Sequence, residues 1–236
     1  LSLKLFSFSV EGDDIRFGLL SIKGISEKSI EKLNNFKDNY STKFEVFQGA
    51  KESGLTIGIL SALIQAGTFE GFQMSRSKIV YEGQLWNILL KKEKAAALKL
   101  GEKFNYDLVK IVKHLCGMKD DNGKHMIKES RLKTIKKRTD PYKEIYNKNN
   151  SSESFANWFY ENTLLGYTYG KRLIDIFHEK TNGLMSVATC EEAEIDETVA
   201  FVGTIEDKPY FGKSRNDNEY MKVFVKDETA AIKVMI

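Results

Sequence analysis

The sequence predicts a mainly α-helical chain whose last forty residues change to β structure. Apolar residues recur at three- and four-residue spacing in the first two thirds, as in Ile57, Leu60, Leu63 and Ile64, which is the period of a helix with one buried face. After Val199, short runs rich in Val, Ile, Phe and Tyr replace this period, as in β-strands. With 42% hydrophobic residues and only two prolines among 236 residues, the chain has enough apolar side chains for a packed core.

The first segments predict a strand and then two helices joined by a glycine turn. Residues 3–10 alternate as a short strand does, and residues 11–14 form a turn. Residues 15–21 read as a short helix, and Ser26 is the expected N-cap of a second helix that reaches about Phe36. Between them lies the sequence Ile22-Lys23-Gly24-Ile25-Ser26. This arrangement is a helix-hairpin-helix.

A glycine turn that opens a helix is suited to a phosphate. The first amides of a helix have no internal partner, and the helix dipole favours an anion at that end. Such contacts fix the position of a nucleic-acid backbone and read no base. We therefore expect sequence-independent binding of duplex DNA, in which amides donate, glycine permits close approach and lysines add charge, at Lys23, Gly24, Ile25, Ser26 and Lys28.

The pattern occurs a second time around Gly67. A helical stretch begins at Phe44 and is interrupted at Gly54, the amphipathic helix near residues 57–64 follows, and a long helix extends from about Ser75 to Leu100. Gly67 is placed as a left-handed C-cap. Gly67 and Thr68 are thus a second candidate phosphate-binding turn, and a simple packing turn is the alternative.

The middle of the chain is basic. We expect a helix over 104–115, a polar loop over 117–124 and a further basic segment over 127–139. This segment either faces phosphates or presents a solvated face; its basic residues are Lys128, Arg131, Lys133, Lys136, Lys137 and Arg138. Residues 147–152 are the clearest linker.

The last part predicts one helix and a three-stranded meander. The helix covers 154–179, the strands cover 199–205, 220–226 and 231–236, and a polar loop covers 210–218. Such a meander is the opening half of a five-stranded OB-type barrel. Aromatic faces and charge combine in the loop, which suits stacking of unpaired bases, unless it is only a mobile hairpin tip; the residues are Tyr210, Phe211, Lys213 and Arg215.

Three domains follow: a DNA-binding domain over 1–150, a helical connector over 151–184 and the N-terminal part of an OB domain over 185–236. The residues from Met185 onward carry eleven acids and six bases, a net charge of −5, so with +3 overall the preceding residues carry +8. A basic body suits an anionic partner, although charge also serves solubility.

Four segments resemble the C-family replicative DNA polymerases, the alpha subunits of bacterial DNA polymerase III. The segments are Ile15-Arg16-Phe17-Gly18-Leu19 with Ile22-Lys23-Gly24-Ile25, then Leu63-Ile64-Gln65-Ala66-Gly67-Thr68-Phe69-Glu70, Glu161-Asn162-Thr163-Leu164-Leu165-Gly166-Tyr167, and the strands from Val199 to Ile236. In order they extend over nearly the whole chain, although the region from Leu98 to Ser154 matches nothing in the family. Departures include Ser26 in place of the second hairpin glycine and Thr168-Tyr169 after Gly166, and they fit a phage-encoded or otherwise remote relative.

The resemblance implies a part of a polymerase that extends DNA from dNTPs. The family's hairpin module holds the duplex, its barrel lies near the single-stranded template, and a short peptide binds the sliding clamp within the replisome. The residues Gln84-Leu85-Trp86-Asn87-Ile88-Leu89 superficially match that peptide, but their spacing favours the core of a helix. The family's catalytic carboxylates and its Mg²⁺ lie upstream of the matching region.

We expect no catalytic residue, resident metal or cofactor in these 236 residues. The three histidines, His114, His125 and His178, are scattered, and Cys116 and Cys190 lack metal or redox spacing. No run reaches the ~20 apolar residues that a membrane span needs, so we expect a cytoplasmic location. The start at Leu1 suggests a piece of a longer protein. The rival readings are a stand-alone repair or recombination adaptor with hairpin and OB modules, and a protein-interaction domain.

Overall fold

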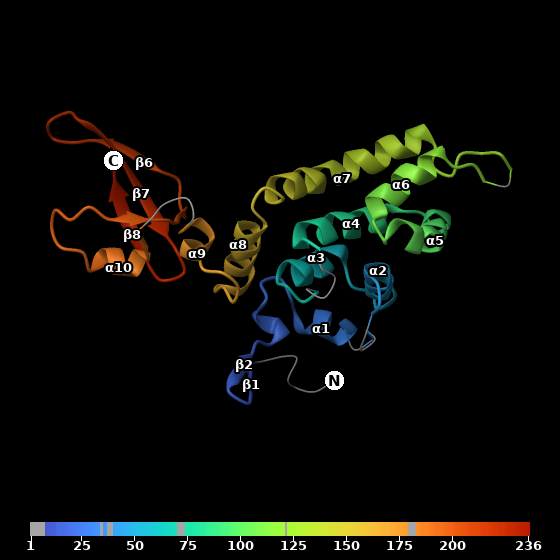
Figure 1. Cartoon of the computed structure of the whole chain (residues 1–236), viewed down its shortest axis with the longest axis horizontal. Coiled ribbons are helices and arrows are strands. Elements are labelled where there is room, and N and C mark those ends of the chain that lie inside the picture. Colours follow the sequence, from blue (N-terminus) through green and yellow to red (C-terminus); the bar gives the residue numbers. More distant parts are fainter. Residues whose placement is uncertain (1–7, 34, 37–39, 70–73, 121, 179–182) are drawn as a thin grey trace. The chain divides into compact units, whose positions relative to one another are not determined.

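The computed structural model describes residues 8–33, 35–36, 40–69, 74–120, 122–178 and 183–236 (Figure 1). The chain divides into two compact units. Unit 1 comprises residues 1–153 and 163–165, and unit 2 comprises residues 154–162 and 166–236. The three-domain division expected from the sequence stays a prediction.

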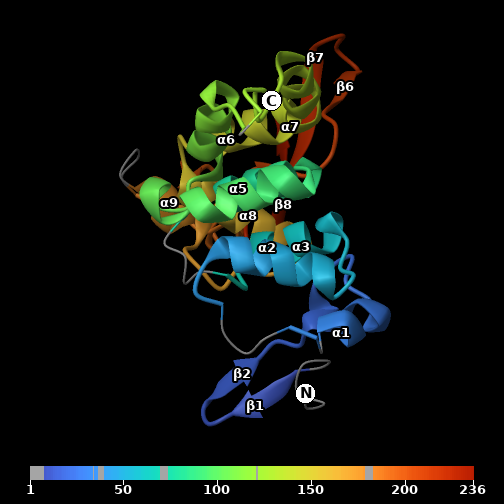
Figure 2. The same ribbon diagram turned by 90° about the vertical axis from the view of Figure 1, so that its right-hand side faces the viewer.

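Unit 1 opens with an antiparallel hairpin of β1 (Ser9–Glu11) and β2 (Asp14–Arg16), whose turn places Gly12 at φ +67°. Figure 2 shows this ribbon extending away from α2 and α3. The expected strand over 3–10 lies largely outside the described residues. The expected helix over 15–21 is wrong: β2 occupies its first part, and only a single 3-10 turn, η2 (Leu19–Ser21), follows.

The rest of unit 1 is helical. Its helices are α1 (Glu27–Leu33), α2 (Lys43–Glu52), α3 (Ile57–Gln65), α4 (Arg76–Ile88), α5 (Lys91–Leu100), η4 (Glu102–Phe104), α6 (Leu108–Gly117) and α7 (Glu129–Asn149). Thr42, Thr56, Ser75 and Asp107 act as N-caps, each accepting a hydrogen bond from an amide three residues on.

Two expected boundaries in unit 1 are corrected. The single helix over 75–100 is two helices, because a new helix starts after Leu90, whose amide donates to Glu93 Oε2 at 2.7 Å. The expected linker at 147 begins later, because α7 continues through Pro141 to Asn149. Residues 104–115 also divide, into η4 and α6.

The main core of unit 1 lies between α2, α3, α4, α6 and α7. Phe44 and Trp86 stack there with ring centroids 5.0 Å apart. The helices α4 and α7 pack along their lengths, with Tyr81 stacked on Tyr146 at 6.4 Å. Burying side chains of this size contributes roughly 1.5–3 kcal/mol each, so this cluster holds the helices that carry the N-terminal turns.

Unit 2 contains parts of α8 (Glu153–Leu165), then α9 (Leu173–Phe177), α10 (Val187–Glu191) and short strands: β3 (Leu184–Met185), β4 (Ala200–Phe201), β5 (Thr204–Ile205), β6 (Tyr210–Lys213), β7 (Glu219–Lys226) and β8 (Ala231–Met235). The helix expected over 154–179 is interrupted at Gly166, where φ is +78°. The mainly helical N-terminal part followed by small sheets confirms the predicted fold class. The OB type stays a prediction.

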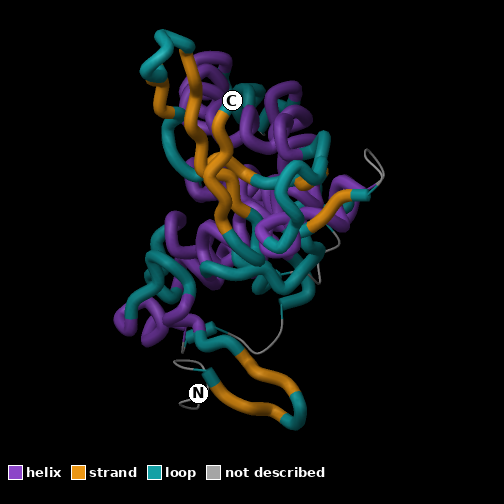
Figure 3. The backbone as a smooth tube through the Cα atoms, turned by 90° about the vertical axis from the view of Figure 1, so that its left-hand side faces the viewer, coloured by secondary structure: helices purple, strands orange, loops and turns teal. Residues whose placement is uncertain are grey.

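The larger sheet is a meander centred on β7 (Figure 3). β8 pairs with one edge of β7, and both β5 and β6 pair with the other edge, since the register places Lys226 and Lys222 each between two partners. Two expectations are wrong here. The strand over 199–205 is split between two sheets, and the loop over 210–218 begins with strand β6.

Asp227 and Glu228 link the larger sheet of unit 2 to its helices by hydrogen bonds. Asp227 Oδ2 accepts the amide of Val187 at the start of α10, and Glu228 Oε2 accepts the Trp158 indole N–H at 3.1 Å. Burial opposes ionisation of Asp227, but hydrogen bonds from Thr229, Val187 and Ala230 together outweigh it and hold the pKa of this carboxyl below its usual value. The two carboxylates, which lie in the turn between β7 and β8, thus connect this turn to helices elsewhere in unit 2.

Candidate nucleic-acid interface

The first hairpin is a tight turn between η2 and α1. The amide of Ile25 donates to the carbonyl of Ile22 at 3.0 Å, and Gly24 has φ +91° at the third position. These are the features of a type II β-turn, which requires a residue that tolerates positive φ. An added Cβ at Gly24 would meet no atom within 4 Å. The positive φ is therefore the only feature that requires glycine here, and the space next to its Cα is open.

Some amides of this turn donate a hydrogen bond within the protein, whereas others have no acceptor and are called open below. The amide of Lys23 donates to the carbonyl of Leu164 at 2.8 Å, and that of Ile25 is used within the turn. The expectation that these two amides contact a phosphate is therefore wrong. Among the described residues, no acceptor is found for the amides of Gly24, Ser26, Glu27 or Lys28. The candidate donors are thus the amide of Gly24 and those of the residues that follow Ile25.

The side chains around these amides are exposed and carry a net positive charge. Lys23, Lys28 and Glu27 are exposed, whereas Ile22 and Ile25 point inward. Glu27 opposes a phosphate locally, so the two lysines leave only one net positive charge. Ser26, whose hydroxyl lies 2.9 Å from that of Ser29, is exposed as well. The turn therefore presents donors and modest charge to solvent.

A small core fixes the turn in place. Ile22, Ile25 and Ile30 pack with Leu63 and Ala66, which immediately precede the second turn. Leu164 and Leu165 pack against the same cluster. The apolar side chains of the turn are thus anchored, while the amides of Gly24, Ser26, Glu27 and Lys28 have no acceptor among the described residues. Sequence analysis did not identify Leu164 as an anchor, because its carbonyl reaches Lys23 only through the tertiary fold.

The second turn has the predicted left-handed glycine but uses its own donors. Gly67, with φ +89°, donates to Ile64 O at 3.0 Å, and the amide and hydroxyl of Thr68 donate to Leu63 O at 3.2 and 2.9 Å. This pair of backbone bonds is the Schellman motif of a helix end. Both amides are consequently unavailable to a phosphate, which favours the alternative of a packing turn.

The basic segment forms the first half of α7. Arg131 is structural, since it pairs with Glu93 at 3.3 Å and donates to Ile88 O at 2.6 Å. Lys128, Lys133, Lys136, Lys137 and Arg138 are exposed. This pattern fits a solvated helix face and is equally open to an anionic partner.

In unit 2, the predicted stacking residues lie on two faces of the sheet. Tyr210 and Phe211 are neighbours in β6, so their side chains point to opposite faces, and the two rings do not form one surface; stacking of unpaired bases here stays a prediction. Tyr210 instead shares its face with Tyr220 and Lys222: its ring centroid is 6.3 Å from that of Tyr220, and the Lys222 ammonium lies 5.7 and 5.0 Å from the two centroids. The sequence analysis did not predict strand β6. If it had, the alternation of side chains along paired strands would have placed Tyr210, Tyr220 and Lys222 on one face.

The segment that resembles a clamp peptide is part of the core. Gln84, Leu85, Trp86 and Leu89 are at most 9% exposed, and all but Leu89 lie in α4. A clamp cannot reach these side chains in the folded unit, so the core reading is confirmed.

The described part of the chain offers neither a metal cluster nor a membrane span. No group of three or more His, Cys, Asp or Glu side chains there is arranged to hold a metal ion. None of the described helices combines the length and apolar character needed to cross a bilayer.

Comparison with protein families gives one match. Residues 4–79 match the family model described as a helix-hairpin-helix motif, and this range includes both glycine turns. Comparisons with curated proteins and with solved structures found no similar chain. The match supports DNA binding in general and does not identify a polymerase. The N-terminal third of the chain therefore contains a helix-hairpin-helix motif, a DNA-binding module.

Proposed function

We propose that the Gly24 turn binds the sugar-phosphate backbone of duplex DNA without reading its sequence. The observation that carries this proposal is the set of outward amides at Gly24, Ser26 and Glu27, beside the exposed Lys23 and Lys28. Amides and ammonium groups contact phosphate oxygens, which are the same at every base pair. A single turn contacts one or two phosphates, so the affinity of this site alone is modest and depends strongly on salt.

Fluorescence anisotropy with labelled duplexes tests the proposal. Two duplexes of unrelated sequence should bind with the same Kd, and Lys23→Glu with Lys28→Glu should weaken both by at least tenfold. The matched control is Lys91→Glu with Lys92→Glu, which makes the same charge change at exposed positions of α5 and should weaken binding no more than threefold. Equal losses in both double variants would show that overall charge, and not this turn, is responsible.

We further propose that this module serves a replicative DNA polymerase, with catalysis and Mg²⁺ supplied by residues outside these 236. The four family-like segments support this role, whereas the helix-hairpin-helix match is equally consistent with the alternative. The alternative is a repair or recombination adaptor. Sequencing the gene around this segment separates them: a polymerase requires an upstream strand bearing Asp-x-Asp, and an adaptor does not.

A second candidate function concerns the exposed face of the β7 sheet. Tyr210 is 60% exposed beside Tyr220 and Lys222, a combination of aromatic faces and charge on which unpaired bases stack. We propose that this face contacts single-stranded DNA. Lys213 and Arg215 remain proposed contacts at the exposed hairpin end.

Binding of a labelled single strand tests this face. Tyr210→Ala with Tyr220→Ala should weaken binding by about thirtyfold or more, since each of the two stacked bases contributes about 1–3 kcal/mol. Phe211→Ala is the control, because this ring is 72% exposed but lies on the opposite face. A larger loss in Phe211→Ala than in the tyrosine variant would contradict the assignment.

A further inference from the structure

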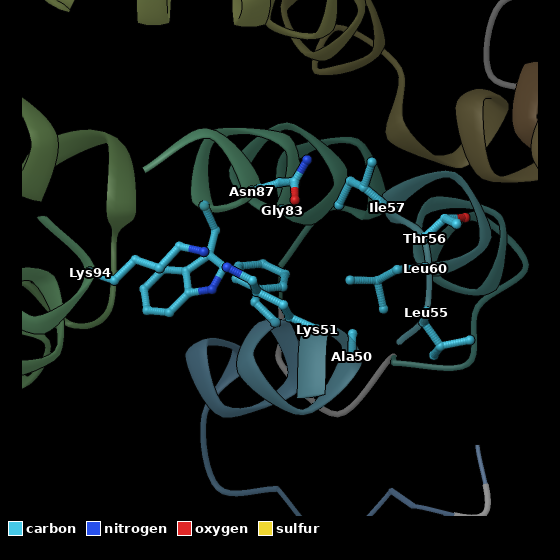
Figure 4. A pocket seen from close by; sticks show the side chains of 11 residues that line it. Ala50, Lys51, Leu55, Thr56, Ile57, Leu60, Gly83, Asn87 and Lys94 are labelled. Carbon is cyan, nitrogen blue, oxygen red and sulfur yellow. The ribbon is translucent and has the colours of Figure 1, made fainter. Parts of the chain in front are cut away.

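A small cavity lies between α2, α3, α4 and α5 of unit 1 (Figure 4). Its volume is about 40 Å³, enough for about three water-sized atoms at ~10–15 Å³ each. Phe47, Leu55 and Leu60 supply much of its apolar wall. The polar groups in the lining are those of Lys51, Thr56, Trp86, Asn87 and Lys94.

Two buried donors at this cavity have no acceptor. Lys94 is 7% exposed and Trp86 is 2% exposed, and neither Lys94 Nζ nor Trp86 Nε1 has a hydrogen-bond partner among the described residues. The only other buried lysine in the described part, Lys43, is paired with the carboxylate of Glu82. An unmet buried donor costs about 1–3 kcal/mol, and more when it is charged. The buried donors of Lys94 and Trp86 therefore still lack an acceptor, whereas the buried ammonium of Lys43 has one.

A second ammonium lies close to the first. Lys94 Nζ is 5.4 Å from the centroid of the Trp86 ring, and the side chain of Lys51 extends from α2 toward that of Lys94 from α5 (Figure 4). Burial, with the neighbouring Lys51 ammonium, lowers the pKa of Lys94 to about 8. At neutral pH Lys94 is thus still mostly protonated. Lys51 lines the same cavity and is exposed, so the cavity adjoins the protein surface.

The face of the Trp86 ring attracts the Lys94 ammonium, but the described lining contains no Asp or Glu that would neutralise the two positive charges. A water molecule would satisfy the indole N–H but would leave two ammonium groups repelling each other. An oxyanion both accepts the hydrogen bonds and neutralises the charge. A phosphate group presents three oxygens and up to two charges to three donor groups, whereas a carboxylate offers two oxygens and one charge.

We propose that Lys51, Lys94 and the Trp86 indole N–H form a binding site for a phosphate group. The phosphate comes either from inorganic phosphate or from a nucleoside monophosphate. The site involves none of the residues of the Gly24 turn, so phosphate binding here can be tested independently of duplex binding at that turn.

The indole N–H signals in a ¹H–¹⁵N spectrum provide the test. The chain has two tryptophans, and Trp158 is an internal control because its N–H already donates to Glu228. Titration with inorganic phosphate, against chloride at equal ionic strength, should move the Trp86 signal in a saturable way and leave the Trp158 signal in place. A nucleoside monophosphate, compared with its nucleoside, distinguishes the two sources.

Variants complete the test. Lys94→Met and, separately, Lys51→Met should each weaken the phosphate response by at least tenfold. Lys92→Met, an exposed lysine on the same helix as Lys94, should leave it unchanged. The proposal is overturned if the Trp86 signal does not respond to either phosphate source, or if it responds equally in Lys51→Met and the wild type.

Discussion

The turns at Gly24 and Gly67 place glycine at nearly the same positive φ, 91° and 89°, over one small core. They differ in where their amides point. At Gly67 a full α-helix ends in a Schellman motif that returns the amides to Leu63 and Ile64, whereas at Gly24 a single 3-10 turn ends in a β-turn and leaves the following amides open. The same glycine signal in the sequence therefore produces a turn with amides that have no acceptor, which we propose as the binding surface, in one place and the end of a helix in the other.

The largest expected difference between the two turns is electrostatic. Lys23→Glu with Lys28→Glu should lower duplex affinity roughly 100-fold at low salt and reduce the slope of log K against log[salt] by about 0.9 for each phosphate that the variant no longer neutralises. Gln65→Glu with Thr68→Glu adds two negative charges at the second turn and should cost no more than about fivefold. Anisotropy titrations at several salt concentrations measure both. Similar slopes for the two variants would remove the distinction between the turns.

Alanine at each glycine gives a smaller and cleaner contrast. Gly24→Ala and Gly67→Ala both force alanine to a positive φ, which destabilises the fold by about 1–2 kcal/mol. Gly24→Ala should also weaken duplex binding by about fivefold, because it shifts the open amides and adds a methyl group in the space before them. Urea unfolding and anisotropy, done on the same samples, separate the two effects. Loss of affinity in Gly67→Ala, at equal stability, would assign DNA contacts to the second turn.

The smallest expected effect comes from adding a positive charge at the second turn, where the amides of Gly67 and Thr68 are already hydrogen-bonded. Thr68→Lys places an ammonium at an exposed position of the second turn but frees no amide. Duplex affinity should therefore rise by no more than about threefold. A gain of tenfold or more would mean that charge density alone limits binding, and that open amides are not the deciding feature.

Much of this fold follows from local patterns. The apolar period over Ile57–Gln65 and the left-handed Gly67 were both predictable, because each depends on a few neighbouring residues. The single 3-10 turn at Leu19–Ser21 was not, since strand β2 takes residues that also fit a helix. The start of α5 was not predictable either, because the residue before it is Leu90, which has no capping side chain, and the contact there is its amide donating to Glu93.

The candidate sites show the same limit. Lys23, Gly24, Ser26 and Lys28 were identifiable from the sequence, yet which amides remain open depends on the carbonyl of Leu164, about 140 residues away. Tyr220 and Lys222 join Tyr210 only through strand register. The cluster of Lys51, Trp86 and Lys94 has no local signature, because three separate helices bring it together.

The open amides are the centre of this account, and a ¹H–¹⁵N titration of the protein with a short duplex observes them directly. The amide signals of Gly24, Ser26 and Glu27 should shift in a saturable, salt-sensitive way, while those of Gly67 and Thr68 stay within the background set by distant residues. Shifts confined to Gly67 and Thr68, or no shift at Gly24 under conditions where the duplex is bound, would contradict it.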